Sequence, residues 1–149
     1  MSKNKLLSVS LVAIMAIAIF HYFAINNGWY WTFRWLDIPV HIVGGFWVSI
    51  MALWIALSIG HIKKITNYKK RAFFIMLGSA LVMAILWEIF ETTFKITFLH
   101  NIGYWRGSLK DIASGLAGGF VAYLYFTKNK KTYCSIFDET IKNDFIINL

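Results

Sequence analysis

The sequence predicts an all-α membrane protein, in which four transmembrane helices form a bundle and both termini lie in the cytoplasm. Three observations predict this fold class. Charged residues make up only 15% of the 149 residues, whereas a soluble domain carries about 25%. Four separate stretches are long and apolar enough to cross a bilayer, and the Lys and Arg residues gather in alternate loops between them.

Each predicted span has about the 20 mainly apolar residues that a transmembrane helix needs. The sequence places these spans at residues 6–25, 38–59, 72–91 and 109–126. They form one membrane domain over residues 1–131, which is followed by a polar cytoplasmic tail over residues 132–149. The basic start and the Ala16-Ile17-Ala18 pattern resemble a signal peptide. Because the apolar run continues to Ile25, beyond the usual length of such a segment, we expect an uncleaved first span.

The direction of the spans follows from the basic residues, because cytoplasmic loops carry an excess of Lys and Arg. Eleven of the 15 basic residues belong to the N-terminal segment, the second loop and the tail; the other four are Arg34, Lys95, Arg106 and Lys110. This distribution predicts a multi-pass protein of the cell membrane with both termini inside. It also explains the net charge of +8 without nucleic acid, for which we find no soluble basic face. The single Cys134 excludes an internal disulfide and a multi-cysteine metal site.

Aromatic residues are frequent in the two loops that this topology places outside. Trp and Tyr are enriched where a membrane meets water, so an interfacial belt is the favoured interpretation. Stacking on a ligand stays open as the alternative. The residues concerned are Trp29, Tyr30, Trp31, Trp35, Tyr104 and Trp105.

The acidic residues outside the tail gather at the predicted outer ends of the helices. The chain has seven acidic residues, and the four outside the tail are Asp37, Glu88, Glu91 and Asp111. His41 in the second span and His21 late in the first span reach the same level. Asp37 and His41 are spaced i,i+4 and Glu88 and Glu91 are spaced i,i+3, so each pair shares one helix face.

Asp111 shares a helix face with small residues, which are Gly115, Gly118, Gly119 and Ala122. Small residues allow two membrane helices to approach closely, and Gly115 and Gly119 form a GxxxG pair. We therefore expect Asp111 to point into the bundle. The same Gly115/Gly119 face is a candidate surface for joining two copies of the chain.

Each of these residues also has a structural interpretation. Asp37 before Ile38-Pro39 is a candidate N-cap, and Ser108-x-x-Asp111 resembles a capping box. His41 alone is typical of a buried core histidine. Glu88 and Glu91 are harder to explain, because negative charge is disfavoured at the C-terminal end of a helix. They are either functional groups or members of a salt-bridge network with Arg34, Lys95, Arg106 or Lys110.

Three motifs resemble those of VanZ-like integral membrane proteins, a group of small bacterial membrane proteins. The motifs are Asp37-Ile-Pro-Val-His41, Trp87-Glu88-Ile-Phe-Glu91, and the segment that runs from Arg106 through Asp111 to Gly118. Their order and spacing fit the pattern of that family over residues 36–119. The sequence departs from the pattern at three positions, where the family often has a basic residue, Asn and Gln; these positions are Ile38, Gly115 and Glu91.

The leading hypothesis is a polar site inside the outer end of the bundle. A divalent metal such as Mg, Mn, Fe or Zn suits one histidine with several carboxylates, and its candidate ligands are Asp37, His41, Glu88, Glu91 and Asp111. The candidate catalytic acid and base groups are His41, Glu88 and Glu91. The substrate would be an amphipathic lipid or envelope precursor, whose anionic head Arg106 and Lys110 would bind.

Two other hypotheses stay open. The same residues would suit a proton or ion relay in a small transporter, since charged groups within membranes mark such pathways. Alternatively, the polar network only fixes the bundle of a structural membrane protein. In each case the surrounding lipids are the expected partners.

Overall fold

The protein is helical throughout the part that the computed structural model describes, which comprises residues 3–59, 68–94 and 104–129. The long helices are α1 (Lys3–Asn26), α3 (Asp37–Ser58), α4 (Tyr68–Phe94) and α5 (Tyr104–Lys128). Between α1 and α3 lie the short helix α2 (Trp29–Thr32) and the 3-10 turn η1 (Arg34–Leu36). The predicted all-α fold class is confirmed. Lys95 and the tail at residues 132–149 lie outside the described residues.

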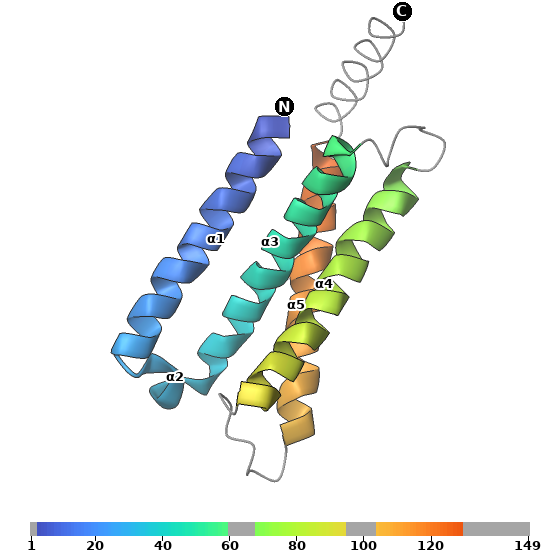
Figure 1. Ribbon diagram of the computed structural model, residues 1–149. Coiled ribbons are helices and arrows are strands. Elements are labelled where there is room, and N and C mark those ends of the chain that lie inside the picture. Colours follow the sequence, from blue (N-terminus) through green and yellow to red (C-terminus); the bar gives the residue numbers. More distant parts are fainter. Residues whose placement is uncertain (1–2, 60–67, 95–103, 130–149) are drawn as a thin grey trace, which may run out of the picture.

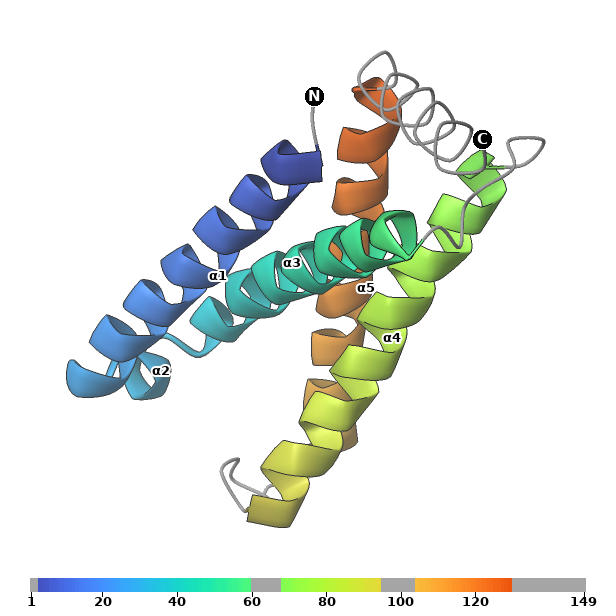
Figure 2. The ribbon, with the colours of Figure 1, turned by 45° about the horizontal axis from the view of Figure 1, so that its top comes forward.

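Helix α3 is the central element of the arrangement. It packs against α1 on one side and against both α4 and α5 on the other, and α4 also packs against α5. Figures 1 and 2 show α3 between α1 and the α4–α5 pair. The start of α1, the end of α3 and the start of α4 lie at one end of the molecule, whereas α2 lies at the opposite end (Figure 1). We call the end with α2 the α2 end.

Three of the described helices are long and apolar enough to cross a membrane, and they correspond to the first three predicted spans. They are Lys5–Asn26, Asp37–Ser58 and Tyr68–Phe94. Helix α5 contains the predicted fourth span, but Lys110, Asp111 and its glycines make it less apolar than the other three. The fourth span therefore stays a prediction.

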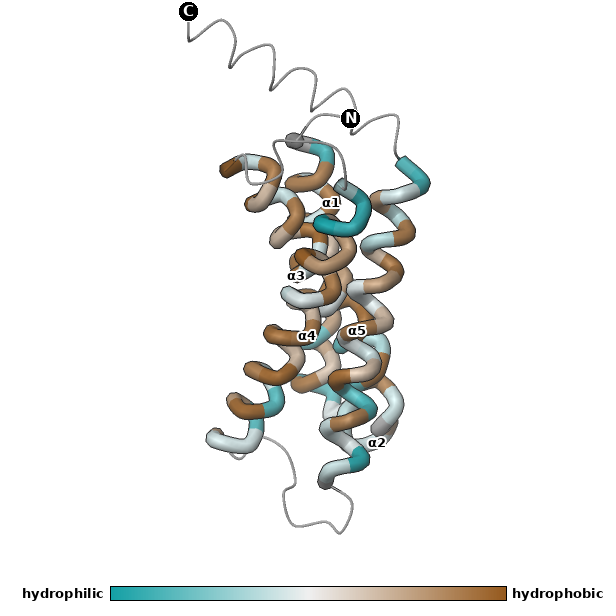
Figure 3. The backbone as a smooth tube through the Cα atoms, turned by 90° about the vertical axis from the view of Figure 1, so that its right-hand side faces the viewer, coloured by the Kyte–Doolittle hydropathy of each residue, from teal (hydrophilic) through white to brown (hydrophobic). Residues whose placement is uncertain are grey.

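The outer faces of α1 and α4 expose large apolar side chains, including Val12, Met15, Phe74, Val82 and Ile89. Soluble monomers rarely expose extended apolar surface, so these faces suit contact with lipid. Figure 3 shows hydrophobic segments along the middle of the helices and hydrophilic segments towards their ends. This pattern and the three apolar helices support a location in a membrane.

The core combines two kinds of packing. Away from the α2 end, larger apolar side chains form the buried cluster, among them Leu6, Ile50, Leu53, Met76 and Phe126. On α4 the buried positions recur every four residues, at Ala72, Met76, Ala80 and Ala84. Because three of these four residues are alanines, α5 can approach α4 closely along this row.

Glycines bring α3 and α5 into direct backbone contact. A Cβ added at Gly45 would collide with the backbone carbonyl of Gly115, and one added at Gly118 would collide with that of Ile42. A Cβ at Gly119 would lie 2.8 Å from the Cβ of Ala80 on α4. We call Gly45, Gly115, Gly118 and Gly119 the glycine seam. The predicted packing role of the small-residue face is confirmed.

The glycine seam also bears on the predicted self-association. Gly115 and Gly119 are buried against α3 and α4 of the same chain. The face that we expected to join two copies is therefore already occupied. Association of two copies through this face stays a prediction.

We expect Gly118→Ala to lower the free energy of unfolding by about 1–3 kcal/mol, because the new methyl group would force α3 and α5 apart. Thermal unfolding of the purified protein in detergent measures the effect. The matched control is Gly78→Ala on α4, where an added Cβ meets nothing within 4 Å. Equal melting temperatures for the two variants would contradict the close approach of α3 and α5.

Candidate functional site

Helix α3 supplies the first two site residues from its first two turns. Asp37 begins the helix, and His41 follows one turn later, with its Nε2 3.3 Å from Asp37 Oδ1. The His41 side chain is 11% exposed and that of Asp37 is 38% exposed. The N-cap position belongs to Leu36, which forms no side-chain capping bond. The interpretation of Asp37 as an N-cap is therefore wrong, and its carboxylate is free to contact His41.

Helix α5 supplies Asp111, which is 7% exposed and points into the bundle as predicted. The capping-box interpretation of Ser108 and Asp111 is wrong, because α5 already begins at Tyr104 and both residues lie inside it. The buried Oδ1 of Asp111 has no hydrogen-bond partner in the described part of the chain. A buried carboxylate oxygen without a hydrogen bond is costly, and the cost favours a cation beside it.

Lys110 is the cation that the structure places beside these acids. Its Nζ lies 3.4 Å from Asp111 Oδ1 and 3.9 Å from Asp37 Oδ2. Its side chain is 41% exposed, so the ammonium reaches the acids from the edge of the bundle. Lys110, predicted to bind a substrate head, is thus engaged with the site itself.

Asp37, His41 and Asp111 form a group that is close enough together to be a candidate metal site. One ligand atom from each residue can be chosen so that all three lie within 4.8 Å of one another. A tetrahedral metal bonded to nitrogen and oxygen at about 2.0–2.2 Å holds its ligand atoms about 3.3–3.6 Å apart. The three side chains would therefore have to move closer together to bind one metal ion. We call these three residues the Asp–His–Asp cluster.

Glu88 and Glu91 approach the cluster from α4 without joining it. Glu88 acts electrostatically on Asp111, and Glu91 acts on His41. Glu91 Oε1 accepts a hydrogen bond of 2.7 Å from the indole N–H of Trp87. Glu88 Oε1 is buried and has no hydrogen-bond partner among the described residues. The two predicted ligands thus form an outer layer around the cluster.

The hairpin from α1 to α2 adds two residues that the sequence analysis did not assign to the site. Gly28 adopts a left-handed conformation with φ 66°, which turns the chain so that α2 folds back beside α1. The Tyr30 hydroxyl then lies 2.8 Å from His21 Nδ1. Burial raises the pKa of Tyr30, and the Asp37 carboxylate raises it further. The phenol therefore stays neutral and can donate a hydrogen bond to His21 Nδ1. The only sequence feature that pointed to this contact was the position of His21 late in the first span, at the same predicted depth as the acids.

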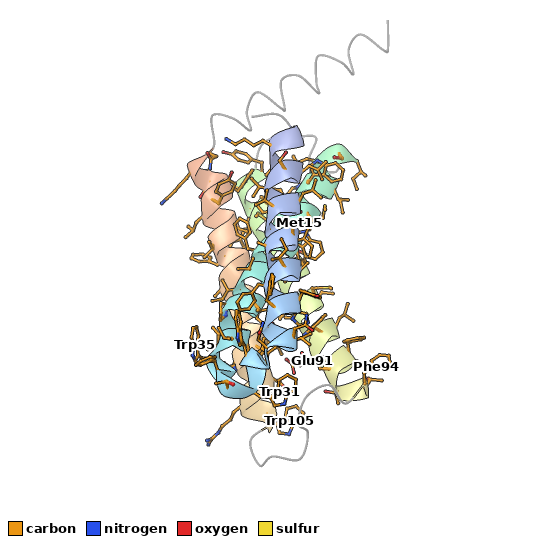
Figure 4. All side chains as sticks on the ribbon, turned by 90° about the vertical axis from the view of Figure 1, so that its left-hand side faces the viewer. Met15, Trp31, Trp35, Glu91, Phe94 and Trp105 are labelled. Carbon is orange, nitrogen blue, oxygen red and sulfur yellow. The ribbon has the colours of Figure 1, made fainter. Side chains whose placement is uncertain are left out.

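The remaining predicted residues lie at the rim of the same end. Arg106 is exposed one turn before Lys110. Trp31, Trp35 and Trp105 are exposed as well, which suits the predicted aromatic belt. Figure 4 shows these three tryptophans at one end of the molecule together with Glu91. The side chains of Arg34 and Tyr104 lie outside the described set.

The comparisons with known proteins agree with this description. Residues 2–132 match the family described as "Predicted membrane protein (DUF2238)". The chain belongs to this family. The match carries no evidence for the VanZ-like proteins, so that resemblance rests on the three motifs alone. No curated protein and no solved structure matches the chain. Membership identifies a membrane protein and assigns no activity to the Asp–His–Asp cluster.

We expect Lys110→Gln to destabilise the metal-free protein by roughly 1–3 kcal/mol, a value between those of exposed and buried ion pairs. The variant leaves Asp37 and Asp111 facing each other without their ammonium. Melting temperatures in detergent with a chelator measure the change. Lys70→Gln removes an exposed charge at the other end of the molecule. An equal loss in both variants would show that the ion pairs of Lys110 contribute nothing specific.

Proposed function

We propose that this membrane protein binds a divalent cation in the Asp–His–Asp cluster and acts there on an amphipathic lipid or envelope precursor. The observation that carries the proposal is the convergence of the ligand atoms of Asp37, His41 and Asp111 within 4.8 Å of one another, from two different helices. The buried Asp111 Oδ1 supports it as well, because it accepts no hydrogen bond from a described residue and has the Lys110 ammonium 3.4 Å away as a cation that a metal could replace. Carboxylate and imidazole ligands together suit Mg, Mn, Fe or Zn.

The charge balance at the α2 end supports a cation beyond Lys110. Four carboxylates lie at or beside the cluster, those of Asp37, Glu88, Glu91 and Asp111. The Lys110 ammonium forms ion pairs with two of them, Asp37 and Asp111, and the His41 imidazole faces Asp37 as well. Excess negative charge in a poorly solvated site is costly. A divalent cation would offset that excess.

The proposed topology places the cluster at the outer surface of the membrane. Four spans starting in the cytoplasm would leave the α2 end outside, and the termini of the described chain lie at the other end (Figure 1). The lysines and arginine that begin α4, Lys69 to Arg71, lie at that other end as well, and so does Lys128. This arrangement follows the positive-inside tendency.

A site at this depth would meet lipid headgroups directly, which motivates the proposed substrate class. Arg106 and Lys110 would hold the anionic head, while His41, Glu88 and Glu91 are the candidate proton donors and acceptors. A metal there would polarise a bound oxygen or activate water. The VanZ-like motifs support an envelope-related role as a resemblance only.

A structural role is the second candidate, and the ion pairs of Lys110 favour it. If the ammonium alone balances the acids, the network needs no metal and serves to join α3 to α5. A proton or ion relay through the same residues would also need no bound metal. Metal binding therefore separates the first proposal from both alternatives.

We expect the purified wild-type protein to bind one divalent cation. The double variant His41→Ala Asp111→Asn should bind that cation at least about 100-fold more weakly, because it loses two of the three proposed ligands. Metal analysis after dialysis and calorimetric titration with Mg, Mn, Fe(II) and Zn measure this. The matched control is Asp144→Asn, which removes a carboxylate from the predicted cytoplasmic tail. Absence of binding by wild type for all four metals would refute the metal site.

We expect the native Cys134 to resist a membrane-impermeant maleimide in intact cells and to react after permeabilisation, because the tail is predicted to be cytoplasmic. In a Cys134→Ser background, Trp105→Cys at the exposed rim of the α2 end should react in intact cells. The reverse labelling pattern would invert the topology and place the cluster on the cytoplasmic side.

A further inference from the structure

We infer that Lys110 is a displaceable counter-ion: a divalent cation entering the Asp–His–Asp cluster releases the Lys110 ammonium, which then joins Arg106 in binding a phosphate group. The inference rests on the proposed function: it identifies the anionic head proposed for Arg106 and Lys110 as a phosphate and makes phosphate binding depend on the metal. Cation and phosphate would therefore bind cooperatively at the α2 end.

The position of the Lys110 ammonium carries the first step. Its Nζ lies 3.4 Å from Asp111 Oδ1 and 3.9 Å from Asp37 Oδ2, so it uses oxygens of the same two carboxylates that a metal would use. The third candidate ligand atom, His41 Nε2, lies 3.3 Å from Asp37 Oδ1, the carboxylate oxygen that Lys110 does not contact. Lysine and metal thus compete for one place.

Competition leads to release because two cations repel each other at such short range. The Lys110 side chain can leave without unfolding the helix, since it is 41% exposed and its ammonium sits at the end of a flexible four-carbon stem. Asp111, in contrast, is buried at 7% exposure and cannot follow. When the metal binds, the Lys110 side chain would therefore move away while Asp111 keeps its place.

Arg106 is the residue with which the released Lys110 ammonium would bind the anion. It lies four residues before Lys110 on α5, so the two side chains share a helix face and begin about 5–6 Å apart. Arg106 is exposed and forms no ion pair with a described side chain. Arg106 lies in the first turn of α5, where the helix dipole also favours an anion. With Lys110 released, two cationic side chains would face one phosphate.

Phosphate is the ligand chemistry that this pair fits, because a guanidinium binds two of its oxygens and an ammonium binds a third as a point charge. The exposed Trp105, next to Arg106, suits the headgroup level of a bilayer. A phosphate on a lipid headgroup and free phosphate share this chemistry, and the experiment separates them.

The test measures each affinity in the presence and absence of the other ligand, using the full-length protein in detergent. Mn²⁺ is the cation probe, and dihexanoyl phosphatidic acid and inorganic phosphate are the two anion probes, each with a protein-free blank. We expect Mn²⁺ to tighten phosphatidic acid binding at least fivefold in wild type and, by thermodynamic reciprocity, phosphatidic acid to tighten Mn²⁺ binding equally. Coupling seen only with inorganic phosphate would support the site and identify the free anion as its ligand.

Variants of Lys110 isolate its role. Lys110→Gln should bind Mn²⁺ about five- to tenfold more tightly than wild type, because the competitor is gone, and its coupling to phosphatidic acid should fall below twofold. Lys110→Arg keeps the charge and should not gain Mn²⁺ affinity. Arg106→Gln should weaken phosphatidic acid binding. Lys70→Gln, at the opposite end, should behave like wild type in all titrations.

Two negative outcomes are distinguishable. If wild type binds Mn²⁺ but Lys110→Gln gains no affinity, or if no anion probe shows coupling, Lys110 is not a displaceable counter-ion and the metal site stands alone. If wild type binds no Mn²⁺ at any concentration tested, the proposed metal site fails and this inference fails with it. Should Lys110→Gln prove unfolded without metal, rescue of its melting temperature by Mn²⁺ reports the same competition.

Discussion

The close approach of α3 and α5 is the constraint on which the rest of the structure depends. Gly45 and Gly118 leave no room for a Cβ because the partner helix's backbone occupies that space. This contact fixes the relative height of the two helices, so that Asp37 and His41 on α3 meet Lys110 and Asp111 on α5. A larger residue in the glycine seam would therefore disturb the cluster as well as the packing.

Bringing these acids together in a membrane protein creates an electrostatic cost that the fold has to offset. Two unit charges 4 Å apart interact with about 4 kcal/mol at an effective dielectric constant of 20. The Lys110 ammonium balances part of the charge of Asp37 and Asp111, while Glu88 and Glu91 add more negative charge from α4. The Lys110 ion pairs thus offset part of this cost, and they involve the same acids that we propose as metal ligands.

The sequence predicted the helices, the common level of the acids and the inward direction of Asp111, because each follows from apolar length or helical spacing along a single segment. It did not predict which acids meet. Asp37, His41 and Asp111 converge whereas Glu88 and Glu91 stay in an outer layer, since this depends on how far α3, α4 and α5 approach one another. Other contacts between segments could not be predicted from the sequence for the same reason. Lys110 was predicted as a substrate ligand, but it is paired with two acids. Tyr30 reaches His21 only because the chain turns at Gly28.

The helix dipoles act in opposite directions on two of the four acids, Asp37 and Glu91. Asp37 lies in the first turn of α3, where the positive end of the helix stabilises its charge. Glu91 lies in the last turn of α4, where the negative end of the helix opposes its charge, and the indole N–H of Trp87 donates a hydrogen bond to it. The site thus combines a favourable carboxylate on one helix with an unfavourable one on another. Helix dipoles alone therefore cannot stabilise both carboxylates, which is why the proposed cation would lie where α3 and α5 bring Asp37 and Asp111 together.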